Sequence, residues 1–112
     1  MFDFKEKVVL ITGASYGLGE QFAYDFARAG ADLILTARSV EQLEGVGERC
    51  REMGSRVAVI PGDVSIEADV KKVISAGIDS LGRIDVLINN AGIADARGVA
   101  AEQFDAETFN RI

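Results

Sequence analysis

Short apolar stretches alternate with segments of helical periodicity along most of this chain. Three of the four stretches are apolar with little alternation between polar and apolar positions. Strands buried on both faces have this pattern, and they are typical of parallel sheets covered by helices. The predicted strands are residues 7–12, 31–37, 56–61 and 84–89.

The segments between these strands carry apolar residues three or four positions apart, which predicts amphipathic helices. Ser39 and Ser65 are candidate caps for the second and third helix. Gly77 lowers the stability of the third helix by about 1 kcal/mol relative to Ala, which allows a local irregularity there. The predicted stripes are Leu18, Phe22, Phe26 and Ala29; Val40, Leu43, Val46 or Gly47, Cys50 and Met53; and Val70, Val73, Ile74, Gly77, Ile78 and Leu81. Residues 101–112 follow a loop and look like the beginning of a fourth helix.

This order of elements predicts an α/β fold. Right-handed crossovers between parallel strands give a doubly wound sheet of Rossmann type with the strand order 3-2-1-4. Residues 1–112 contain no linker, low-complexity tract or further repeat, so we expect one partial dinucleotide-binding domain.

Composition narrows the classes of partner. The chain of 112 residues has a net charge of −6 and no His, which argues against nucleic acid and anionic membranes as partners. No apolar run approaches the roughly 20 residues of a membrane span, and residues 2–7 are too polar for a signal peptide. Cys50 is the single cysteine and has no partner for an internal disulfide, which favours a reducing, cytoplasmic location.

The joint between the first strand and the first helix carries three glycines, spaced G-x-x-x-G-x-G. It reads Thr12, Gly13, Ala14, Ser15, Tyr16, Gly17, Leu18 and Gly19. Glycines let the backbone turn tightly and approach a ligand, and the helix N-terminus beyond them favours a pyrophosphate. The alternative is tight packing of the strand against the helix.

The second predicted strand ends at Arg38 and Ser39 without a carboxylate. An acidic residue here would bind the ribose 2′-hydroxyl of NAD, whereas Arg accommodates the 2′-phosphate of NADP. Arg38 makes paired hydrogen bonds to phosphate in this interpretation, and Ser39 adds another. The alternative is a solvated Arg at a helix start.

Two polar groups follow the third and fourth predicted strands. Asp63, followed by Val64, can accept a hydrogen bond from an adenine amino group, or it can be a simple turn residue. Asn89, Asn90, Ala91 and Gly92 form a small-residue turn whose amides can tie adjacent loops together, although such pairs of Asn are common in loops.

Together these motifs resemble the short-chain dehydrogenases/reductases over essentially the whole chain. The resemblance implies that residues 12–19 hold the cofactor pyrophosphate and ribose, and that Asp63 contacts adenine beside Val64. It implies that residues 89–92 support the sheet and line the adenosine region. Arg38 matches members that prefer NADP(H), but Tyr16 stands where many of those members carry a basic residue.

The resemblance also implies an oxidoreductase that transfers hydride between NADP(H), with NAD as the weaker candidate, and a small carbonyl or alcohol substrate. The family's catalytic Asn, Ser, Tyr and Lys have no counterpart here, because Tyr16 and Tyr24 lie in the first turn and first helix. We therefore expect the N-terminal half of such an enzyme, inactive alone. The alternative is a non-catalytic dinucleotide-binding, structural or regulatory module. A fourth strand without its neighbour would leave an apolar edge, and we expect a homo-oligomer that forms through that edge or through the last helix.

Overall fold

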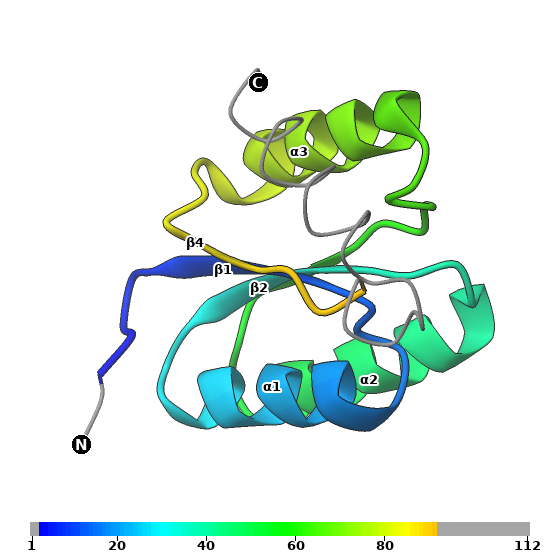
Figure 1. Ribbon diagram of the computed structural model, residues 1–112. Coiled ribbons are helices and arrows are strands. Elements are labelled where there is room, and N and C mark those ends of the chain that lie inside the picture. The colour runs from blue at the N-terminus through cyan, green and yellow to red at the C-terminus, as the bar shows by residue number, and fades with distance from the viewer. Residues whose placement is uncertain (1–2, 92–112) are drawn as a thin grey trace.

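The computed structural model describes residues 3–91, which form a parallel sheet between two helical layers (Figure 1). Its strands are β1 (Val8–Thr12), β2 (Asp32–Thr36), β3 (Val57–Val59) and β4 (Val86–Ile88). They lie in the order β3-β2-β1-β4, and every adjacent pair is parallel. The predicted fold class and strand order are thereby confirmed.

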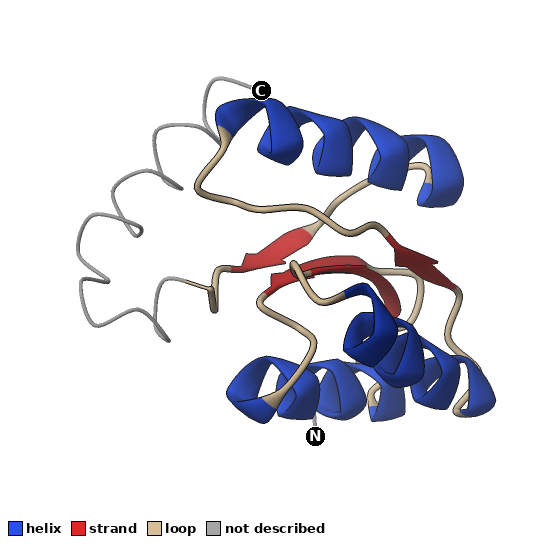
Figure 2. Cartoon of the chain, turned by 90° about the vertical axis from the view of Figure 1, so that its right-hand side faces the viewer, coloured by secondary structure: helices blue, strands red, loops and turns tan. Residues whose placement is uncertain are grey.

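The helices are α1 (Gly17–Arg28), α2 (Val40–Glu52) and α3 (Glu67–Leu81). Viewed along the strands, α1 and α2 cover one face of the sheet and α3 covers the other (Figure 2). Because the strands are parallel, the carboxyl ends of β1, β2 and β4 lie at the same edge of the sheet, beside the first turns of the helices.

The central strand β1 is buried along its whole length, as its apolar sequence predicts. Val9 and Ile11 face the layer of α1 and α2, and Val8 and Leu10 face α3. Because side chains alternate along a strand, a strand covered on both faces has no polar side. This is why β1 reads as a continuous apolar run.

Small residues set how closely the helices approach the sheet. A Cβ atom at Gly77 would lie 2.6 Å from Ile34 Cδ1, and one at Gly47 would lie 2.6 Å from Val59 Cγ2. The irregularity predicted at Gly77 is absent, since α3 is continuous across it. Gly77 instead lets α3 pack directly on β2.

Several predicted core positions are wrong. Leu18, Val40, Met53 and Ile78 are among the exposed apolar side chains, while α1 buries Gly19, Ala23 and Ala27. The helical period was identified correctly, but the small residues of α1 lie against the sheet and its larger side chains flank the contact.

The predicted caps are also wrong in detail. Ser39 occupies the N-cap position of α2 without a side-chain hydrogen bond to the helix. The N-cap of α3 is Ile66, and the Ser65 hydroxyl donates to Asp63 instead. Gly92 and the predicted helix at residues 101–112 lie outside the described residues.

Candidate functional site

The turn between β1 and α1 has a backbone that glycine permits. Gly13 and Gly17 have φ angles of +63° and +60°, a region that other residues rarely adopt. A side chain at Gly19 would overlap the carbonyl oxygen of Gly13, so the first turn of α1 lies directly on the loop. Tyr16, Gly17 and Leu18 are exposed, so the N-terminus of α1 is open to solvent beside the glycine turn, as a phosphate site requires.

The Thr12 hydroxyl joins this turn to the end of β4. It accepts hydrogen bonds from the backbone N–H groups of Asn90 and Ala91, at 2.9 and 3.0 Å, and donates to Asn89 Oδ1 at 3.2 Å. Asn90 adds a bond from its Nδ2 to the carbonyl oxygen of Gly13, at 3.1 Å. Two loops that lie far apart in the sequence are thus held as one unit.

The end of β2 contributes Arg38 and Ser39. Arg38 is exposed and Ser39 is half-buried, at the entrance to α2. The backbone N–H of Gly62 donates to the carbonyl oxygen of Ala37, at 3.1 Å, which ties the turn after β3 to this strand end. The backbone next to Arg38 is therefore held in place, while the exposed side chain of Arg38 can contact a ligand.

Asp63 begins the turn between β3 and α3. Its Oδ1 accepts hydrogen bonds from the Ser65 N–H at 2.9 Å and the Ser65 hydroxyl at 2.7 Å. These bonds, with a smaller contribution from the positive charge of Arg38, hold the pKa of Asp63 below its usual value. Asp63 is a turn residue, as one of the two sequence interpretations predicted, and it remains an anionic acceptor at neutral pH.

The predicted site residues thus gather at the carboxyl edge of the sheet. Thr12, Gly13, Asn90 and Ala91 are in mutual contact, and Arg38 is close enough to Asp63 to affect its ionisation. Tyr16, the N-cap residue of α1, and Leu18, in its first turn, are exposed, at 60% and 51% of their surface. Ser15 is buried beneath that turn, and Val64 lies beside Asp63.

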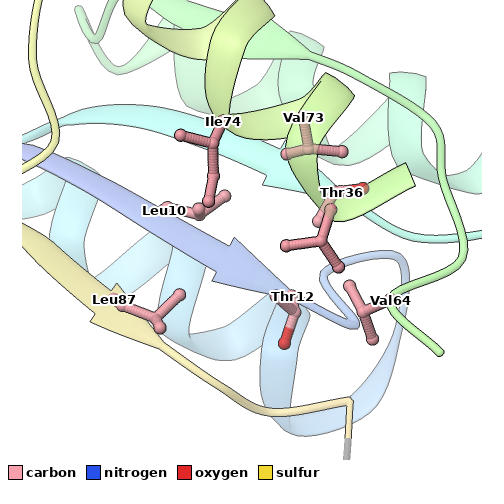
Figure 3. Close-up of a pocket in the computed structure, with 8 residues that line it drawn as sticks. Leu10, Thr12, Thr36, Val64, Val73, Ile74 and Leu87 are labelled. Atoms are coloured by element: carbon pink, nitrogen blue, oxygen red, sulfur yellow. The ribbon is translucent and has the colours of Figure 1, made fainter. Parts of the chain in front are cut away.

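Figure 3 shows a feature that the sequence did not predict, a small cavity between the sheet and α3. Its volume is about 20 Å³, and Thr12, Thr36 and Val64 line it beside apolar residues of β1, β4 and α3. Thr36 is fully buried, and within residues 3–91 its hydroxyl has no hydrogen-bond partner. A cavity of this size admits about one water molecule, so a larger ligand would occupy the open edge above it.

Other reactive groups do not form a second site in the described part of the chain. Burial raises the pKa of the Cys50 thiol to about 11, which keeps it protonated and poorly nucleophilic. The Tyr24 hydroxyl donates to Glu20 and accepts from Arg49, both at 2.6 Å. Arg49 also donates to Glu20 at 3.1 Å, so the bonds of Arg49 join α2 to α1. Residues 3–91 hold no group of three metal-ligating side chains, and none of their helices is long and apolar enough to span a bilayer.

Comparison with known proteins identifies the class to which this site belongs. The family model of the short chain dehydrogenases matches residues 7–112. The chain therefore belongs to the short chain dehydrogenase family.

Individual relatives agree with this assignment. The chain is 52% identical over 92 residues to the 11-beta-hydroxysteroid dehydrogenase-like protein 4A of Arabidopsis thaliana, covering 81% of this chain and 31% of that protein. It is similar to a crystal structure of a short chain dehydrogenase/reductase from Burkholderia phymatum in complex with NAD. That match has a TM-score of 0.73 and 33% identity, and covers 78% of this chain and 31% of the other.

A second structure is a metagenomic short-chain oxidoreductase in complex with NADP. Its TM-score is 0.70 with 31% identity, over 75% of this chain and 38% of the other. The chain thus spans about a third of the length of these relatives.

Proposed function

We propose that the carboxyl edge of the sheet binds a nicotinamide dinucleotide. The observation that carries the proposal is the β1–α1 turn, whose positive φ angles at Gly13 and Gly17 present the backbone at a helix N-terminus. The pyrophosphate lies at this turn, with Ser15, Tyr16 and Leu18 around it. The adenosine half extends toward Arg38 and Asp63, and Asn90 and Ala91 line the ribose region.

The preferred cofactor in this proposal is NADP(H). Arg38 supports it, because its guanidinium forms paired hydrogen bonds with phosphate, and the neighbouring Ser39 offers a further donor. No carboxylate stands at this strand tip, where NAD-binding proteins place one to hold the ribose hydroxyls. One similar structure contains NAD and the other contains NADP, so the preference proposed for this chain depends on Arg38.

Titration of the chain with NADPH and NADH, followed by cofactor fluorescence, tests the proposal. Arg38→Glu should weaken NADPH binding by about tenfold or more, because it removes a charged hydrogen bond to the 2′-phosphate and places a carboxylate that repels this phosphate. NADH affinity should change little, since NADH has no 2′-phosphate. Equal losses for both cofactors would contradict the role of Arg38, and no binding of either would contradict the site itself.

For the whole protein we propose hydride transfer between NADP(H) and a carbonyl or alcohol substrate, in a reducing compartment such as the cytoplasm. Membership of the family supports the reaction, and the single buried Cys50 supports the compartment. The 112 residues alone should turn over no substrate, because they lack the family's Tyr and Lys pair. Turnover above background by the chain alone would overturn this part.

The alternative function is a dinucleotide-binding module without catalysis. A reading frame that continues past Ile112 into a Y-x-x-x-K segment would favour the oxidoreductase over this alternative.

A further inference from the structure

The turn between β3 and α3 is held by hydrogen bonds to two other elements. On one side the Gly62 N–H donates to Ala37, immediately before Arg38. On the other side the N–H of Asp63 donates to Asp69 Oδ2, at 2.9 Å. The turn is closed internally by the bond from the Ile66 N–H to the Asp63 carbonyl oxygen, at 2.9 Å.

Asp69 is well placed to fix the direction of the Asp63 side chain. It lies in the first turn of α3, and its carboxylate reaches back past the N-cap to a residue six positions earlier. A side chain at Gly62 would contact Val73 and Asp69, so α3 packs directly against this turn. The amide of Asp63 is anchored by Asp69 and its Oδ1 is held by Ser65, which leaves its Oδ2 without a hydrogen bond among residues 3–91.

We propose that Asp69 is a positioning residue for adenine recognition: its hydrogen bond to the Asp63 amide aims the Asp63 carboxylate at the adenine amino group. The inference rests on the proposed function, because it assumes that the adenosine half of the cofactor lies at this turn. Asp69 itself touches no ligand in this proposal and acts only through Asp63.

The test uses NADPH and its reduced hypoxanthine analogue, which carries an oxygen in place of the 6-amino group of adenine. The unmodified chain should bind NADPH about tenfold more tightly, because a carboxylate accepts a hydrogen bond from the amino group and repels the oxygen. Asp63→Ala should bring the ratio of the two dissociation constants close to one. Asp69→Ala should do the same although Asp63 is intact.

Asp69→Asn provides the rescue, since its amide oxygen still accepts from the Asp63 N–H, and the ratio should stay near that of the unmodified chain. Asp79→Ala is the matched control, because it removes an exposed carboxylate from the last turn of the same helix. A general loss of stability would weaken the binding of both ligands equally and leave the ratio of their dissociation constants unchanged.

If Asp69→Ala fails to fold, Asp69→Ser replaces it, because its hydroxyl is too short to reach the Asp63 amide and Ser is tolerated in a first helical turn. An unchanged ratio in the folded variant overturns the inference. A chain that binds both ligands equally overturns the adenine contact of Asp63 and the inference with it. A chain that binds neither ligand overturns the proposed function, which is a separate result.

Discussion

Two threonines at the ends of adjacent strands show how one side chain can have opposite effects on stability. Thr12 and Thr36 are partners in the register of β1 and β2, and both are buried. The Thr12 hydroxyl is fully engaged with residues 89–91, whereas the Thr36 hydroxyl has no partner within the described residues. The same substitution therefore tests both environments.

Thr12→Val should destabilise the chain by roughly 2 kcal/mol, because it leaves the N–H group of Ala91 without its acceptor and the N–H group of Asn90 with only the carbonyl oxygen of Ile88. Urea unfolding measures the loss, and Thr12→Ser, which keeps the hydroxyl, is the control. A Val variant as stable as the Ser variant would contradict the role given to the hydroxyl.

Thr36→Val should stabilise the chain by about 1 kcal/mol, since the change replaces an unsatisfied buried hydroxyl by a methyl group of similar size. The same unfolding measurement applies. Destabilisation would show that the hydroxyl has a partner, such as a water molecule in the adjoining cavity.

At the scale of elements, glycines within helices differ according to what they face. Gly77 in α3 lies against Ile34, whereas a Cβ atom at Gly45 in α2 would meet nothing within 4 Å. Helix propensity favours Ala at both positions, so only the packing separates them.

Gly45→Ala should raise the free energy of unfolding by up to about 1 kcal/mol, because it removes the entropic cost of glycine in a helix. Gly77→Ala should lower it by roughly 1–3 kcal/mol, because the new methyl group overpacks the contact with Ile34. Thermal unfolding of the two variants side by side checks the pair, and stabilisation at Gly77 would refute close packing of α3 on β2.

The stability of the turn between β3 and α3 should depend on pH through the ionisation of Asp63. Because the folded-state pKa of this carboxyl is lowered, its contribution is present above the unfolded value of about 3.9 and is lost as the pH falls through the folded value. The stability difference between the unmodified chain and Asp63→Asn should be constant above about pH 5 and shrink as the pH falls below about 4. A difference that stays constant as the pH falls below about 4, measured by urea unfolding, would argue against it.

Sequence patterns predicted the strands, their order and the clustering of the motifs, because each depends on local periodicity and on a chirality rule. The prediction that Leu18 and Val40 face the core was wrong, because both side chains are exposed. In α1 the small residues lie against the sheet, since they allow the helix to approach it closely. The bond from Asp63 to Asp69 and the orphan hydroxyl of Thr36 were also missed. They depend on side-chain positions across a tertiary contact, which no pattern within one element encodes.

At the scale of the whole molecule, β4 is an edge strand of the described sheet. Among residues 3–91 it pairs with β1 alone, and its residues are half-buried. An unpaired apolar edge offers free backbone groups to another strand, so we propose self-association of the chain through β4.

Sedimentation velocity at rising concentration tests this self-association, and we expect dimers or larger species at tens of micromolar. Association through backbone pairing and apolar contact should persist in about 1 M salt, where interactions between surface charges are screened. A monomer at those concentrations would refute the proposal.

The bonds of Thr12 to residues 89–91 also determine when the site can form. They join positions 77–79 residues apart, so the glycine turn is tied down only after nearly all of the described chain has been made. Contacts of such sequence separation are slow to form, because the intervening chain must first be ordered. During synthesis the turn would emerge early and remain without these hydrogen bonds until β4 had been made and had paired with β1.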